Sequence, residues 1–139
     1  MSLTPAGDAK LLLPDGWASP RGYSHGVSVS GRIVTVAGQI GWNPETAKFE
    51  SDDFVDQVRQ ALKNVVAVLG EANASPSRLV RLTWFITERE EYIVSRREIG
   101  AVYREVIGNH YPPMSIVIVS GLIEERAKVE IEATAVIPE

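Results

Sequence analysis

The sequence predicts one domain of the α/β (α+β) class, built as a mixed β-sheet with two helices on one face. Pairs of strand-like runs, each joined by a glycine-containing segment, lie near both ends of the chain and are typical of hairpins. Two longer runs with apolar residues at every third or fourth position lie between them and are typical of amphipathic helices. This order, with strands at both ends and helices between them, favours a mixed sheet whose helices lie on the same face.

The first part of the chain is expected to be an irregular arm followed by a hairpin. Residues 1–20 contain repeated prolines and glycines, and we assign them to an irregular N-terminal arm of a single domain that spans residues 1–139. A short strand is expected over residues 10–13 within this arm. Ser24–Val29 and Ile33–Ala37 alternate on either side of a glycine turn, which predicts that these two runs pair with each other.

The middle of the chain predicts helix, strand and helix in that order. A stripe of apolar residues begins at Phe54, after an acidic N-cap segment, and it places Gln57 and Asn64 on the solvent side of the first helix. Alternating residues predict a strand over 79–87. Residues 87–107 then predict a second amphipathic helix, which ends at the following glycine.

The last two strand-like runs raise the question of what covers the second face of the sheet. Four successive apolar residues within Ser115–Val119 are typical of a strand that is covered on both faces. Residues 128–137 alternate, so that Glu130 and Glu132 point away from the apolar side. Either both carboxylates meet water, or they line a cavity that something else closes. Self-association through this face is the simplest cover.

Composition excludes several classes of function. The chain has 139 residues, of which 45% are hydrophobic and 23% charged, a net charge of −4 and no cysteine. Disulfides, thiolate nucleophiles and cysteine-based metal sites are therefore excluded. The acidic balance argues against a nucleic-acid partner, because such binding needs a basic face. No apolar run is long enough to span a membrane, and the N-terminus lacks the layout of a signal peptide, so we expect a cytoplasmic protein.

Few residues offer catalytic chemistry, and each has a structural alternative. His25 and His110 are far apart in sequence and lack metal-ligand spacing, and His110 is expected in a surface loop. Ser24 and His25 are neighbours on a strand and point to opposite faces, which argues against a hydrolase triad. Glu130 in a partly dry cavity would position or deprotonate water, and the hydroxyl of Tyr23 would orient a substrate. Alternatively, the carboxylate is solvated and the tyrosine is a packed aromatic.

Several segments together carry a family resemblance. They are Arg21-Gly-Tyr-Ser-His-Gly, Val36-Ala-Gly-Gln-Ile, Asn43-Pro-Glu-Thr, Gln57-Val-Arg-Gln-Ala-Leu-Lys-Asn-Val, Leu82-Thr-Trp-Phe-Ile-Thr, Pro113-Met-Ser and Val129-Glu-Ile-Glu-Ala-Thr-Ala-Val. In this order they resemble the RidA family, also called the YjgF or endoribonuclease L-PSP family, over about residues 20 to 137. The resemblance implies a chorismate-mutase-like fold and a homotrimer whose sheets form an inner barrel. It also implies small-molecule sites between subunits, without a metal or cofactor.

The resemblance assigns roles by position. Tyr23 matches the tyrosine of the family's site, Glu130 matches the glutamate that handles the catalytic water, and Gly38 falls where backbone approaches the ligand. Phe85, Met114 and Ser115 are then expected to line the substrate site.

Met114 is also a departure from the family pattern, because deaminating members carry an arginine there that grips the substrate carboxylate. A thioether cannot replace that guanidinium, and the lost contact costs on the order of 2–5 kcal/mol. Gly100 is a second departure, near the position of a family asparagine. The resemblance thus implies a sibling subfamily that lacks the arginine and is not the usual 2-aminoacrylate deaminase. Arg126 and Arg81 are candidates for a replacement cation.

Three functions stay open on this evidence. The first is a hydrolytic deaminase of a small enamine or imine, in which Glu130 and Tyr23 are catalytic. The second is a non-catalytic trimer that binds or senses a small ligand. The third is an endoribonuclease or translation inhibitor, which is disfavoured because the chain has neither a basic stripe nor an acid–base histidine pair.

Overall fold

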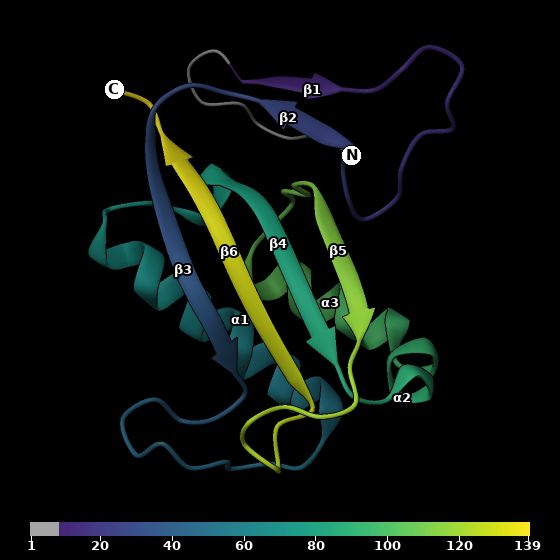
Figure 1. The fold of residues 1–139 in the computed structure, drawn as a ribbon, viewed down its shortest axis with the longest axis vertical. Helices are drawn as coiled ribbons and strands as arrows, with labels where there is room; N and C mark the ends of the chain where they lie inside the picture. Colours follow the sequence, from purple (N-terminus) through teal and green to yellow (C-terminus); the bar gives the residue numbers. More distant parts are fainter. Residues whose placement is uncertain (1–8) are drawn as a thin grey trace.

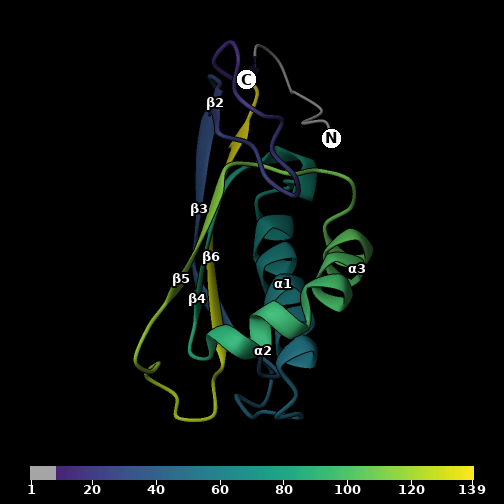
Figure 2. The ribbon, with the colours of Figure 1, turned by 90° about the vertical axis from the view of Figure 1, so that its right-hand side faces the viewer.

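The computed structural model describes residues 9–139, which form a four-stranded sheet, a small two-stranded sheet and a layer of helices (Figure 1). The elements in chain order are β1 (Lys10–Leu12), β2 (Gly26–Ser28), β3 (Arg32–Ile40), α1 (Phe54–Glu71), a 3-10 turn (Pro76–Arg78), β4 (Leu79–Ile86), α2 (Arg89–Val94), α3 (Arg96–Val106), β5 (Met114–Ile118) and β6 (Val129–Ile137). The helices all lie against one face of the larger sheet (Figure 2). The predicted fold class is therefore confirmed.

Neither predicted hairpin forms. The strand order of the larger sheet is β3-β6-β4-β5, in which β6 is antiparallel to both neighbours and β5 is parallel to β4. β2 pairs with β1 and not with β3. Gly31 explains this difference, because a Cβ there would collide with the backbone of Ile137; the chain passes close beside β6 at this point and enters the larger sheet. β5 is an edge strand, and its Val117 is 41% exposed in the single chain, so the predicted cover on both faces would have to come from another copy and stays a prediction.

The first helix follows its predicted stripe, with two exceptions. Asp53 is the N-cap and its carboxylate accepts a hydrogen bond from the Asp56 amide at 3.0 Å. Gln57 and Asn64 are buried, although their spacing predicts a solvent position. Both side chains bond to backbone groups. Gln57 accepts a hydrogen bond from the Lys128 amide and donates to the Ser51 and Arg126 carbonyls, and Asn64 donates to the carbonyls of Ile40, the last residue of β3, and Trp42. Buried loop backbone needs such partners, and helix periodicity does not reveal that need.

The second predicted helix is divided at Ser95 into α2 and α3. Gly108 follows α3 with φ of 99°, in the left-handed region that favours glycine, as predicted for the helix end.

His110 is only 4% exposed, so the expected surface position is wrong. Its Nε2–H donates to the Leu79 carbonyl at 2.8 Å, and the Tyr103 hydroxyl donates to the His110 carbonyl at 2.7 Å. Burial lowers the pKa of His110, although the bond to Leu79 acts in the opposite direction.

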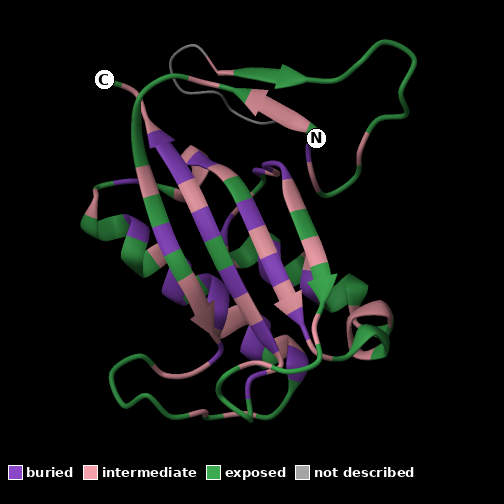
Figure 3. Ribbon diagram, in the orientation of Figure 1, coloured by how far each residue is buried: buried purple, intermediate pink, exposed green. Residues whose placement is uncertain are grey.

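The face of the sheet opposite the helices carries no helix (Figure 2). Burial alternates along β6 and β4 (Figure 3), and the predicted inner residues of β6, which include Val129 and Ile131, are buried. We call the opposite side the open face. It exposes apolar side chains as well as carboxylates: Ile33 is 69% exposed there. Of the helices within residues 9–139, none combines the length and apolar character that a membrane-spanning segment needs.

Candidate functional site

The predicted site residues fall into two groups on opposite sides of the sheet. Phe85 is paired with Glu130 of β6 in the strand register, so both lie on the open face. Ser115 also lies on this face, because it is paired with Thr83, two residues before Phe85. Met114 is paired with Leu82, which is buried on the helix side. One chain therefore does not bring Glu130 and Met114 together.

Glu130 and Gly38 form the centre of the open-face group. A register shift between Val36 and Gln39 places Gly38 at an irregularity of β3, beside β6. A Cβ added at Gly38 would collide with the Glu130 carboxylate, so only glycine leaves room for this carboxylate over β3. Within residues 9–139 the Glu130 side chain has no hydrogen bond or ion pair. The carboxylate is thus positioned by packing and is free to bind water or a ligand.

Tyr23 and Met114 form the second group, on the helix side. Ser24 ties the N-terminal arm to the segment before β5: its amide donates to the Pro112 carbonyl at 3.3 Å, and its hydroxyl donates to the Tyr111 carbonyl. The ring of Tyr23 packs edge-on against His25, with 5.3 Å between centroids. Because of this attachment, Tyr23 and Met114 line the same cavity.

This cavity, which we call the α3 cavity, has a volume of about 780 Å³ and lies between α3 and the start of β5. Its walls are mainly aromatic and apolar and include Tyr92, Trp84 and Ile116. Arg21, Arg96 and Arg104 also line it, and none of the lining residues within 9–139 is acidic. The helix side of the candidate site is therefore an apolar cavity with a positive charge.

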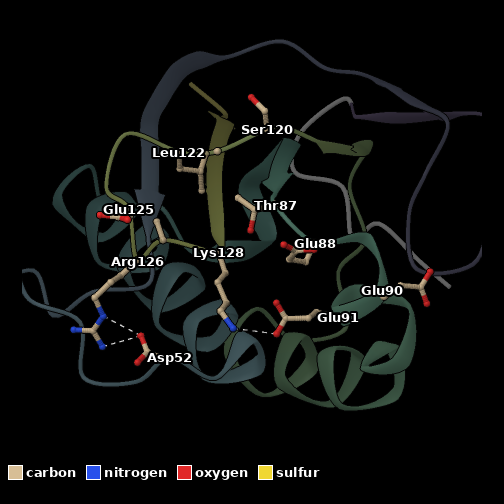
Figure 4. Close-up of a pocket in the computed structure, with 12 residues that line it drawn as sticks. Asp52, Thr87, Glu88, Glu90, Glu91, Ser120, Leu122, Glu125, Arg126 and Lys128 are labelled. Carbon is tan, nitrogen blue, oxygen red and sulfur yellow. Dashed lines mark hydrogen bonds and ion pairs between the residues drawn. The ribbon is translucent and has the colours of Figure 1, made fainter.

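A second cavity of about 700 Å³, the acidic cavity, lies beyond the end of β5 (Figure 4). Five carboxylates line it, with two cations, Arg126 and Lys128. Both cations are paired: Arg126 Nη2 lies 2.8 Å from Asp52, and Lys128 Nζ lies 3.0 Å from Glu91. Among the described residues no group of three or more histidine, cysteine or acidic side chains is arranged to hold a metal ion.

Within one chain, the two predicted replacement cations lie outside the α3 cavity. Arg126 belongs to the acidic cavity and also stacks over the Phe49 ring, 5.4 Å from its centroid. Arg81 is paired with Thr134, four residues further along β6 than Glu130, and it does not line the α3 cavity.

Comparison with known proteins identifies the family. The family model described as Endoribonuclease L-PSP matches residues 17–137. The crystal structure of the YjgF gene product of Escherichia coli is 31% identical, with a TM-score of 0.65 over 82% of this chain and 87% of that one. This chain belongs to the YjgF/RidA family.

Two other relatives of this YjgF/RidA protein are informative. "Putative reactive intermediate deaminase TdcF" of Escherichia coli is 35% identical over 117 residues, which cover 82% of this chain and 85% of TdcF. YyfB, a Rid-family protein of unknown function from Yersinia pestis, has a TM-score of 0.82 and 28% identity, and the match covers 94% of this chain and 100% of YyfB. The resemblance found in the sequence is therefore confirmed at the level of family and fold.

The residues that sequence reasoning missed are the arginines of the α3 cavity in this YjgF/RidA chain. Arg96, Gly100 and Arg104 recur at intervals of four, which places them on one face of a helix. That signal was available in the sequence. What the sequence does not contain is the packing that turns this face toward Met114, because that contact depends on how α3 lies against β4 and β5.

Proposed function

We propose that the protein is a hydrolytic deaminase of a small enamine or imine, acting in a pocket between the subunits of a homotrimer. The observation that carries the proposal is the Glu130 carboxylate, which lies over Gly38 without a partner among the described residues. The name of TdcF, a reactive intermediate deaminase, supports the reaction class.

Assembly follows from the division of the site. Glu130 lies on the open face and Tyr23 on the helix side, so a pocket that holds both needs a second copy of the chain. Ile33 and Val117 give that copy apolar surface to cover on the open face. Three copies that close with their open faces inward would bury these side chains and leave a pocket at each junction.

The chemistry proposed for the pocket is water addition followed by loss of ammonia. Glu130 takes a proton from water as the water oxygen bonds to the imine carbon. Glu130 passes this proton to the imine nitrogen, which gives a neutral carbinolamine. The same carboxylate then takes the hydroxyl proton of the carbinolamine and delivers it to nitrogen as the C–N bond breaks, so that ammonia leaves and a carbonyl product remains. The hydroxyl of Tyr23 donates a hydrogen bond that orients the substrate. Met114 offers no charge, so the pocket does not take 2-aminoacrylate in the manner of an arginine-bearing site.

The test is to generate imines in place with an amino acid oxidase and to measure release of keto acid and ammonia. Glu130→Gln is expected to lower the rate about 100-fold, since a general acid–base group contributes at least that much. Glu132→Gln is the matched control, because Glu132 lies on the same face two residues along the strand and is exposed. Full activity of Glu130→Gln, or a monomer by light scattering, would refute the proposal.

A non-catalytic ligand-binding trimer is the second candidate, favoured by the α3 cavity, which exists without any contribution from Glu130. In that case the cavity would bind ligands and no imine would be hydrolysed faster than in buffer. Ribonuclease activity is not proposed, because His110 is buried with its Nε2 engaged and His25 packs between the rings of Trp17 and Tyr23. These positions do not form an acid–base histidine pair.

A further inference from the structure

We propose that Arg96 and Arg104 of α3 bind the carboxylate of a ligand that has a bulky aromatic or apolar body. The anion-binding cations of this chain would then lie on the helix and not at the start of β5. The identity of the ligand, an imine of a large apolar 2-amino acid, rests on the proposed function. The binding site itself is argued from the α3 cavity alone.

The geometry of α3 brings the two guanidinium groups toward one place. Arg96 and Arg104 lie on either side of Gly100 at four-residue spacing, and all three line the cavity. Long side chains on a helix lean toward its N-terminus. Arg104 follows this rule: its Nη1 lies 3.5 Å from the position of a Cβ at Gly100. The Arg104 guanidinium thus lies back over the helix, beside Gly100 and toward Arg96.

The charges of this cavity have no counterion among the described residues. Arg21, Arg96 and Arg104 make no ion pair or side-chain hydrogen bond within residues 9–139, and no carboxylate lines the cavity. By contrast, Arg59, Arg89 and Arg126 each lie within 4.0 Å of a carboxylate. Burial raises the pKa of Tyr92, which lines the cavity, and the nearby charge of Arg96 lowers it in part. An anion bound here would give these exposed guanidinium groups the charged partner that the described part of the chain does not supply.

Trp84 supplies an independent indication of a ligand. Its side chain lines the α3 cavity and is 2% exposed, and its indole Nε1–H has no acceptor within the described part of the chain. A buried donor without a partner is costly, and native structures almost always provide one. Trp84 borders the cavity, so a ligand oxygen that reaches this nitrogen would supply the acceptor that Trp84 lacks.

The walls and the size decide the rest of the ligand. Tyr23, Tyr92 and Met114 present apolar surface, and the volume of about 780 Å³ is that of a site for a drug-sized molecule. A three-carbon acid would leave most of this surface in contact with water. The best fit is therefore a carboxylate joined to an aromatic ring or to a long aliphatic group, such as the imine of phenylalanine.

The test measures binding and does not need catalysis. Phenylpyruvate, the keto acid product of that imine, is titrated into the full chain by calorimetry. Arg96→Gln and Arg104→Gln are each expected to weaken binding about tenfold or more, as for loss of a charge-assisted hydrogen bond. Arg97→Gln, which removes the same charge from an exposed position of α3 outside the cavity, is the matched control and is expected to leave the affinity unchanged.

Further ligands test each part of the assignment. Pyruvate is expected to bind at least tenfold more weakly than phenylpyruvate, and so is phenylacetone, which has the ring without the carboxylate. If pyruvate bound as tightly as phenylpyruvate, the claim that the ligand has a bulky apolar group would be wrong. If inorganic phosphate bound more tightly than phenylpyruvate, the claim that the site selects a carboxylate would be wrong. Unchanged affinity in the Arg96→Gln/Arg104→Gln double variant would overturn the site. If phenylpyruvate binds through these arginines while no imine is hydrolysed, the anion site stands and the proposed reaction fails.

Discussion

The α3 cavity and the acidic cavity have similar volumes, about 780 and 700 Å³, and cationic side chains line both. They differ in whether these cations are paired with carboxylates of the chain. In the acidic cavity Arg126 and Lys128 are neutralised by carboxylates of the chain itself. In the α3 cavity the arginines lie among aromatic lining residues, and no carboxylate of the described chain lines it. The difference teaches that a cationic side chain marks a ligand site only where the fold has not already supplied its partner.

The sharpest way to break this comparison is to give the α3 cavity a carboxylate of its own. Gly100→Glu would place one four residues from both Arg96 and Arg104, where it would pair with them. Phenylpyruvate binding should fall by about 100-fold or more, because a like charge would then oppose the ligand. At the same time the free energy of unfolding should rise by about 1 kcal/mol, since glycine is unfavourable inside a helix.

Gly100→Ala is the control for that change. Its Cβ would lie 3.5 Å from Arg104 Nη1, an ordinary contact, so it should keep ligand affinity and gain about 0.5–1 kcal/mol of stability from helix propensity. Calorimetry and urea unfolding of both variants check these values. Retained phenylpyruvate affinity in Gly100→Glu would show that the arginines do not bind the anion.

A second change separates reaction from binding. Gly38→Ala would force the Glu130 carboxylate away from its position over β3. Because small misplacements of a reacting group are costly, the rate of imine hydrolysis should fall roughly 10-fold to 100-fold. Phenylpyruvate affinity should hold, since Gly38 is remote from the α3 cavity lining. If affinity and rate fell together, the two sides of the site would not be independent.

Acid pH tests the buried histidine that lies behind the α3 cavity. The pKa of His110 is lowered in the folded protein, so the unfolded chain takes up the proton at a higher pH than the folded chain. Stability is therefore fully present above the unfolded pKa of about 6.5 and is lost as the pH falls through the lowered folded value. Urea midpoints between pH 7.5 and 5 should decrease.

His110→Gln keeps a donor for the Leu79 carbonyl and removes the titrating ring. Its urea midpoint should change less over the same pH range. An equal decrease in the variant would assign the effect to other groups.

The smallest expected effect concerns the acidic cavity. Asp52→Asn frees Arg126 from its ion pair, which is largely exposed to solvent, so the free energy of unfolding should fall by less than about 1 kcal/mol. Phenylpyruvate affinity should not change, because carboxylates still surround the freed cation. A gain in affinity from this substitution would mean that pairing alone decides which cavity binds anions.

Sequence patterns predicted the elements and the inner face of β6, because these depend on local periodicity. They did not predict strand pairing: β6 inserts between β3 and β4, and this choice depends on contacts between distant segments. The sequence also named Glu130 and Met114 as parts of one site between subunits; the register sets them on opposite faces of one chain, so their meeting across a junction between copies stays a prediction. Gln57 and Asn64 were misplaced because their partners are loop backbone groups that periodicity cannot reveal.

The central position of β6 has a consequence for how the chain is made. β3 pairs only with β6 in the larger sheet, and β6 also provides the antiparallel partner of β4. During synthesis from the N-terminus, β3 must wait with unpaired backbone until Val129–Ile137 has emerged. A nascent chain arrested earlier would expose the edges of two strands, so aggregation of unfinished chains and protection by chaperones are to be expected at this stage.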